Sequence, residues 1–144
     1  IPSLLSLPYL GICEADDPLY KRTRAFVLSC KNPYFFNGKA AKGIGSPHTP
    51  TNSIWPIALC VQGLTAIERE ERVETLRLLL TTHANTARMH ESFNKDDPSI
   101  FTRSWFAWAN SMLGELIMQM YEKGELKEAV QALLSKGIND IKIT

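Results

Sequence analysis

One short stretch of the chain places a carboxylate, a histidine and several charged side chains directly before a run of aromatic residues. Residues 90–98 read HESFNKDDP, and residues 101–110 read FTRSWFAWAN. A carboxylate beside a histidine, in a loop at the mouth of a helix, suits general base chemistry. The aromatics suit a sugar platform, because a ring face covers the apolar C–H face of a pyranose, although packing is the default for at least one of Trp105 and Trp108. Glu91 is therefore the candidate catalytic base.

Glu91 also has a structural interpretation. A carboxylate in a loop can cap the next helix, or it can pair with Arg88 or Arg103. A single carboxylate cannot hydrolyse a glycoside alone. The reaction needs an acid that protonates the leaving oxygen, and a base or nucleophile on the opposite face of the sugar.

Four aspartates compete for the role of that acid, and each has a structural alternative. Asp96 and Asp97 follow the candidate base closely in sequence. A proline follows Asp97, and this pair is typical of a helix start, with the aspartate as N-cap and the proline as the first helical residue. Asp16 and Asp17 precede a proline in the same way.

A second loop, Gly43–Asn52, carries glycines, prolines and polar side chains. Long loops without periodicity are usually functional or mobile in compact proteins. We expect hydrogen bonds to sugar hydroxyls from His48 in this loop and from His90, while Trp55 at the following helix start is a candidate site aromatic. The glycines match no phosphate-binding fingerprint, and the histidines lack zinc-site spacing, so no metal ligands and no cofactor are expected.

Apolar residues at helical spacing, together with cap and turn residues, predict a series of helices. The predicted helices are Leu19–Cys30, Ser53–Gly63, Thr65–Thr82, Ser99–Lys123 and Glu125–Ser135. Asn52 and a capping box at Thr65–Glu68 indicate two of the starts, and Gly124 indicates a stop. Asn37-Gly38 after an aromatic run predicts a small hairpin.

These helices alternate between short turns and long loops, which is typical of a helical toroid with tight links at one rim and the site at the other. Twelve helices of average length, ~11–12 residues each, would use nearly all of a 144-residue chain. We therefore expect an all-α chain forming about half of an (α/α)₆ toroid. The apolar residues 1–10 lack a polar lead-in, so we expect Ile1 to be a cut inside a larger fold.

Composition excludes several classes of protein. The hydrophobic fraction of 44% and the charged fraction of 22% are typical of a globular chain. A net charge of +1 argues against a nucleic-acid partner that needs a basic field, and no apolar run in this segment approaches the ~20 residues of a membrane span. Three cysteines without metal spacing favour buried free thiols, with a Cys13–Cys30 disulfide as the alternative. The charge run at residues 68–72 favours a solvated helix face.

Several blocks of the chain resemble glycoside hydrolase family 125, the exo-acting α-mannosidases. They are residues 1–11, 37–56, 83–93 and 101–116, which include GIGSPHTP and HESF. The Glu/Arg-rich helix and the tail after Tyr121 are similar to the family only in character.

The resemblance implies inverting removal of terminal α-1,6-linked mannose by a metal-independent (α/α)₆ toroid. Glu91 matches the family's general base, while the family's acid is an upstream Asp that has no counterpart here. Residues 1–144 would then be the C-terminal portion of a single catalytic domain, inactive alone and held by the rest of the polypeptide, with a mannose-containing glycan as substrate. The candidate substrate-binding residues are Ser46, His48, Asn52, Trp55, His90 and Ser92.

Two other functions remain open at this stage. The chain could be a non-catalytic helical carbohydrate-binding or interaction module. It could also belong to a different helical-toroid hydrolase with another sugar specificity. Turnover of an α-1,6-mannobioside separates the first alternative from an enzyme.

Overall fold

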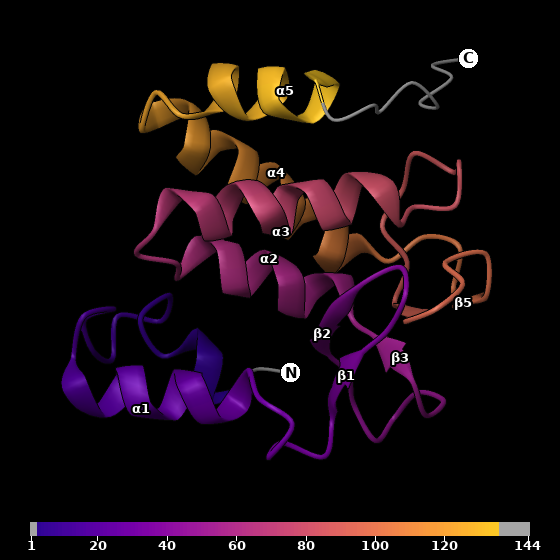
Figure 1. Ribbon diagram of the computed structural model, residues 1–144, viewed down its shortest axis with the longest axis horizontal. Coiled ribbons are helices and arrows are strands. Elements are labelled where there is room, and N and C mark those ends of the chain that lie inside the picture. Colours follow the sequence, from indigo (N-terminus) through magenta and orange to yellow (C-terminus); the bar gives the residue numbers. More distant parts are fainter. Residues whose placement is uncertain (1–2, 136–144) are drawn as a thin grey trace.

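Five α-helices dominate the described part of the chain, which comprises residues 3–135 of a computed structural model. They are α1 (Pro18–Val27), α2 (Pro56–Leu64), α3 (Arg69–Thr81), α4 (Ala107–Glu122) and α5 (Leu126–Ser135). A 3-10 turn, η1 (Leu4–Ser6), precedes α1. Figure 1 shows the helices as a stack, with α2 in contact with α3 and α4 and with α1 and α5 on the outside. Within this range no helix combines the length and apolar character that crossing a membrane requires.

Two helix ends form as the sequence predicts. The Asp17 carboxylate accepts hydrogen bonds from the backbone N–H groups of Leu19 (2.7 Å) and Tyr20 (2.9 Å) at the start of α1. Gly124 follows α4 with a φ of 69°, which glycine adopts without strain. Both signals are local, because a cap needs only its own helix. On α1, Tyr20 and Val27 are buried, whereas Phe26 is exposed.

Two small antiparallel sheets lie at one end of the helices (Figure 1). Their strands are β1 (Phe35–Asn37), β2 (Lys42–Ile44), β3 (Ser53–Ile54), β4 (Ser92–Asn94) and β5 (Phe101–Thr102). The pairing of β1 with β2 confirms the hairpin predicted at Asn37-Gly38, while β3, β4 and β5 form a sheet in that order. Strands of two or three residues are too short to show an alternating pattern, so the all-α prediction describes the helices and misses the three-stranded sheet.

Two predicted helix starts are wrong because the second sheet takes their residues. Ser53–Ile54 pairs with β4, so α2 begins at Pro56. Asn52 precedes that strand with a φ of 68° and does not cap a helix. On the other side of β4, Phe101–Thr102 forms β5, so α4 begins at Ala107 instead of Ser99.

The predicted capping box at Thr65–Glu68 is also wrong. The Thr65 hydroxyl donates a hydrogen bond to the Val61 carbonyl (2.7 Å), so Thr65 ends α2 and α3 begins only at Arg69. The links from α2 to α3 and from α4 to α5 are both short, and both lie at the end of the helices away from the sheets (Figure 1). The helices therefore have a tight end and an end with long loops.

The core is centred on α2, most of whose residues are buried. A Cβ on Gly63 would lie 2.6 Å from the Thr75 hydroxyl of α3 and 2.9 Å from a Leu116 methyl group of α4, so glycine lets both helices approach α2. Burial raises the pKa of the Cys60 thiol to about 12. All three cysteines are free, but the prediction of buried thiols is right only for Cys60, since Cys30 is exposed.

The charge run at residues 68–72 is only partly solvated: Glu68 and Glu70 are exposed, as predicted, but Arg72 is not. Arg72 is buried, and its guanidinium binds the Glu125 carboxylate through two hydrogen bonds of 2.7 and 2.5 Å. A third nitrogen, Nη1, donates to the carbonyls of Ala66 and Ile67. The prediction was wrong for Arg72 because charge spacing along a helix does not reveal a partner 53 positions away.

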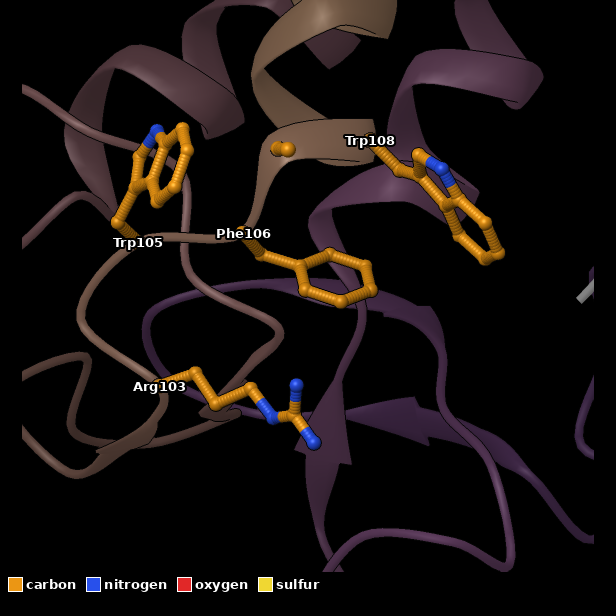
Figure 2. Close-up of a pocket in the computed structure, with 5 residues that line it drawn as sticks. Arg103, Trp105, Phe106 and Trp108 are labelled. Carbon is orange, nitrogen blue, oxygen red and sulfur yellow. The ribbon is translucent and has the colours of Figure 1, made fainter.

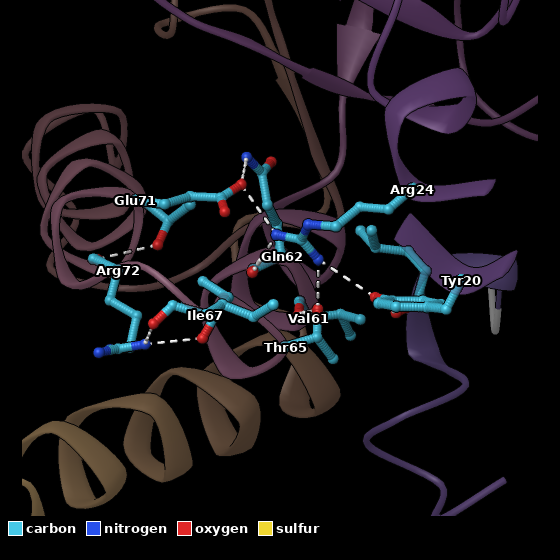
Figure 3. A network of polar contacts seen from close by, with 11 residues as sticks. Tyr20, Arg24, Val61, Gln62, Thr65, Ile67, Glu71 and Arg72 are labelled. Atoms are coloured by element: carbon cyan, nitrogen blue, oxygen red, sulfur yellow. Dashed lines mark hydrogen bonds and ion pairs between the residues drawn. The ribbon is translucent and has the colours of Figure 1, made fainter. Parts of the chain in front are cut away.

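A second arginine joins α1 to the same end of the helices (Figure 3). Arg24 forms an ion pair with Glu71 of α3 at 2.8 Å and donates to the hydroxyls of Thr65 (2.7 Å) and Tyr20 (3.2 Å). The Gln62 amide donates to the same glutamate (2.8 Å). The tight end of the fold is therefore cross-linked by buried and partly buried polar groups.

Candidate active site

Glu91 lies where β4 begins, at the end of the molecule with the long loops. Its backbone N–H donates to the Thr102 carbonyl at 3.2 Å, and the hydroxyl of the buried Ser92 lies 2.8 Å from the Thr102 hydroxyl. The order β3–β4–β5 puts two segments on opposite sides of the Glu91 strand. One is the glycine loop, Gly43–Asn52, which leads into β3. The other is the aromatic segment, Arg103–Trp108, which follows β5.

Asn110 of α4 fixes the backbone just before Glu91. Its side-chain carbonyl accepts from the Met89 N–H (3.1 Å), and its amide donates to the carbonyls of Met89 (3.0 Å) and Phe106 (2.8 Å). The Phe106 N–H also donates to the Met89 carbonyl (2.9 Å). Sequence analysis missed this clamp, for which the only signal is a polar amide near the start of an apolar helix.

His90 is buried behind Glu91. Its ring stacks on Phe101 with a centroid distance of 3.7 Å and an interplanar angle of 1°. Its Nδ1 lies 3.1 Å from the Ser104 carbonyl oxygen, and its Nε2 lies 3.3 Å from that of His83. His90, like Ser92, thus has its polar atoms engaged by protein groups, which gives both residues a supporting position behind Glu91.

The Glu91 carboxylate faces Arg103, one of the two arginines that the sequence offers as partners. Arg103 Nε lies 3.5 Å from Glu91 Oε2, with the Glu91 side chain 18% exposed and the Arg103 side chain 68% exposed. Arg103 has a φ of 46°, which is uncommon for a residue other than glycine and is held by the structure on both sides. The carboxylate is therefore shielded, while the guanidinium faces solvent.

Two of the competing aspartates are held in their ionised form. The Lys95 ammonium and the backbone N–H of Lys39 bind Asp96 and lower its pKa below the usual value. The hydroxyl and backbone N–H of Ser99 lower the pKa of Asp97. A proton donor at neutral pH needs a raised pKa, so neither residue suits the role of the acid. Asp97 also does not begin a helix.

Asp16 and Asp17 lie far from Glu91. Both precede α1, which is across the molecule from β5 in Figure 1. None of the four aspartates considered from the sequence therefore serves as a proton donor beside Glu91. In the described range, 3–135, no group of three or more His, Cys, Asp or Glu side chains converges as a metal ion would require.

The glycine loop approaches the aromatic segment through Trp55. The Trp55 indole N–H donates to the Thr49 hydroxyl (2.8 Å), and its buried ring meets Phe106 edge-on at a centroid distance of 6.2 Å. Within the loop, the hydroxyl of the buried Ser46 accepts from the backbone N–H of His48 (3.2 Å), whose side chain is exposed. Thr49 of the loop is therefore linked to the aromatic segment through Trp55.

Asn52 lies at the other end of the sheet. Its carbonyl accepts from the backbone N–H of Lys95 (2.8 Å), which follows β4, whereas Glu91 precedes β4. Four residues of extended chain separate these positions by ~13 Å. Of the candidate residues, Trp55 thus approaches the aromatic segment and Asn52 lies away from Glu91.

The aromatic segment forms a pocket of about 300 Å³ beside the candidate base (Figure 2). Its lining residues are Arg103, Trp105, Phe106, Ala107 and Trp108. Phe106 and Trp108 pack edge to face at a centroid distance of 5.9 Å. In Figure 2 the side chains of Arg103, Phe106 and Trp108 extend to one side, whereas Trp105 points away. Trp105 precedes α4, and both Trp105 and Trp108 are largely exposed, so neither is a buried core residue.

Comparison with known proteins gives this geometry a context. A family model for metal-independent α-mannosidases (GH125) matches residues 1–118. The chain is 46% identical over 124 residues to the meiotically up-regulated gene 157 protein of Schizosaccharomyces pombe, covering 85% of this chain and 24% of that protein.

A solved structure is also similar: a metal-independent α-mannosidase from Streptococcus pneumoniae, in a non-productive complex with α-1,6-mannobiose. It has a TM-score of 0.81 and 49% identity, and the match covers 83% of this chain and 28% of that one. The chain thus spans about a quarter of the length of these relatives. With 118 of its 144 residues matched by the family model, the chain belongs to the metal-independent α-mannosidases of glycoside hydrolase family 125.

Proposed function

We propose that this chain supplies the general base of an inverting exo-α-mannosidase that removes terminal α-1,6-linked mannose from a mannose-containing glycan. The observation that carries the proposal is the position of Glu91, a shielded carboxylate on a backbone fixed from both sides, next to an open aromatic pocket. Family membership and the mannobiose complex of the S. pneumoniae relative support the substrate class.

In this mechanism Glu91 accepts a proton from a water molecule as the water oxygen attacks the anomeric carbon. The bond from that carbon to the leaving oxygen breaks, and an acid on the opposite face protonates the leaving oxygen. The two carboxyl groups must lie ~6.5–9.5 Å apart to admit the water. The acid is an aspartate outside residues 1–144, since Asp96 and Asp97 are held ionised and Asp16 and Asp17 lie across the molecule.

The same proposal extends to the architecture. Residues 1–144 form the C-terminal portion of a single (α/α)₆ catalytic domain and contribute about half of its ring. The short links at one end of the helices and the long loops at the other support this arrangement, and a match to about a quarter of each relative supports a contribution of at most half. The rest of the same polypeptide then completes the ring and carries the acid.

The terminal mannose binds, in this proposal, on the glycine-loop side of Glu91. Ser46 and His48 supply polar contacts, and Trp55 forms part of the wall. The loop's approach to the aromatic segment through Trp55 supports this assignment. His90 and Ser92 act by holding the Glu91 backbone. Asn52 is not proposed to contact the sugar, because it lies at the end of β4 away from Glu91.

The variant Glu91→Gln of the full-length enzyme tests the proposal. Hydrolysis of α-1,6-mannobiose should fall ~10²–10⁴-fold, because the amide cannot accept the proton of the attacking water. Mannose binding and the melting temperature should be unchanged, and Glu122→Gln, an exposed position on α4, is the matched control.

Near-normal turnover by Glu91→Gln would remove Glu91 from the mechanism. NMR of the first product should show β-mannose, and α-mannose would contradict inversion. If the wild-type enzyme binds mannosides without turnover, the non-catalytic carbohydrate-binding module becomes the better assignment.

A further inference from the structure

His90 is a buried ionisable side chain whose two ring nitrogens both face carbonyl oxygens. Nδ1 lies 3.1 Å from the Ser104 oxygen, and Nε2 lies 3.3 Å from the His83 oxygen. The His83 oxygen also accepts hydrogen bonds from the backbone N–H (3.0 Å) and the hydroxyl (2.7 Å) of Thr86. A carbonyl oxygen only accepts, and a neutral imidazole carries a proton on one nitrogen alone. Either neutral tautomer therefore turns a nitrogen lone pair toward an oxygen lone pair.

The contact between His90 and Phe101 favours the doubly protonated ring as well. The two rings are parallel within 1°, and their centroids are 3.7 Å apart. Neutral aromatic rings prefer offset or edge-to-face arrangements to a face-to-face sandwich. A cation over the face of a phenyl ring is instead attracted by the quadrupole of that ring. Two independent contacts thus fit an imidazolium better than a neutral imidazole.

The charged groups on the segments around His90 are unequal in strength. Burial disfavours the charged form of His90. The Glu91 carboxylate follows directly in the chain, its side chain is 18% exposed, and its negative charge favours the imidazolium. Arg88 is exposed and Arg103 is 68% exposed, so solvent screens these two positive charges more than it screens Glu91. The nearby charges therefore help to offset the cost of burial.

We propose that His90 is a positioning residue that acts as an imidazolium, donating one N–H to the loop at residues 83–88 and one to the aromatic segment. This inference rests on the proposed function of Glu91 as the base. The loop needs such a tie, because Ala84 and Ala87 have φ values of 52° and 53°, which alanine rarely adopts. The contribution of His90 is present at low pH and is lost as pH rises and the ring gives up one proton.

Histidine-selective ¹⁵N NMR of the full-length enzyme tests the protonation state directly. At the pH of maximal activity, both ring nitrogens of His90 should resonate as protonated nitrogens, and their absence in His90→Phe or His90→Gln assigns them. His83 is the internal control, because its Nδ1 accepts from the Ala87 N–H (3.3 Å) and should resonate as an unprotonated nitrogen. A neutral His90 ring at this pH overturns the proposal.

Kinetics test the positioning role. His90→Phe keeps a ring for the stack and loses both donors, so kcat for α-1,6-mannobiose should fall about tenfold with KM little changed, because a misplaced base loses its alignment with the water. The ratio of wild-type to variant kcat should fall as pH rises through the point at which NMR shows the loss of the His90 proton.

Equal kcat values for wild type and His90→Phe, or a ratio that does not change with pH, overturn the positioning role. Near-normal turnover by Glu91→Gln overturns the proposed function instead. The NMR result for His90 does not depend on turnover, so the two failures are distinguishable.

Discussion

The Arg72–Glu125 pair at the tight end of the helix stack and the Arg103–Glu91 pair at the loop end differ in burial and in hydrogen bonding. At the tight end, Arg72 and Glu125 have side chains that are 6% and 14% exposed and share two hydrogen bonds. At the loop end, Arg103 is 68% exposed and meets Glu91 at 3.5 Å through one nitrogen. The first pair is saturated by protein groups, whereas the second leaves the arginine open.

The difference separates a structural pair from a pair at the candidate site. A buried ion pair is stable only when its remaining donors and acceptors are satisfied, as the carbonyls of Ala66 and Ile67 do for Arg72. A site pair must instead keep donors available for a ligand. The backbone at Glu91 is nevertheless fixed as firmly as a core segment, by Asn110 and Thr102. At the site, hydrogen bonds thus fix the backbone, while the exposed Arg103 side chain keeps donors available for a ligand.

The largest effect that this comparison predicts is on stability at the tight end. Arg72→Ala should lower the free energy of unfolding by about 3 kcal/mol, because it leaves the Glu125 carboxylate buried without a partner. Arg77→Ala on the same helix is the control, since its exposed pair with Glu74 is worth less than about 1 kcal/mol. Urea unfolding of both variants measures the difference. Equal losses would mean that the Arg72 pair is no more structural than a surface pair.

A smaller effect should appear in the pH dependence of stability. The hydrogen bonds from Arg72 lower the pKa of the Glu125 carboxyl in the folded state below its unfolded value of ~4.3. Its contribution is therefore present above about pH 4.3 and is lost as pH falls through the folded pKa. The stability advantage of wild type over Glu125→Gln should shrink between about pH 5 and pH 3 in thermal melts. A pH-independent difference would contradict the charge-based role.

The smallest predicted effect is on stability at the loop end. Arg103→Ala should change the free energy of unfolding by less than about 0.5 kcal/mol, because an exposed arginine at 3.5 Å contributes little to the folded state. Arg88→Ala, an exposed position in the same loop region, gives the baseline. A loss above 1–2 kcal/mol in urea unfolding would show that Arg103 has a structural role like that of Arg72.

Local signals in the sequence were reliable where one element decides the outcome. Asp17 caps α1 and Gly124 ends α4, since neither needs a distant partner. Asn52 and Thr65 have the right chemistry for helix caps, but neither starts a helix. Asn52 precedes a paired strand, and Thr65 ends α2. Gly45 lies in the loop that the sequence predicts to be functional. A Cβ there would collide with the Ser53 carbonyl, so close packing alone requires glycine at this position.

The sequence by itself determined the presence of five helices, the family and the identity of the candidate base. Helical periodicity and the motif HESF both depend on residues that are close together in the sequence. Only the tertiary structure decided which candidates are buried and which lie near Glu91. In the fold, His90 and Ser92 are buried behind Glu91, and Asn52 lies at the far end of β4. Arg103 and Trp108 line the pocket. The physical reason is that strands of two or three residues leave no pattern in the sequence, and that the pairing of β3 with β4 joins distant segments, yet these strands set which way the side chains at the site face.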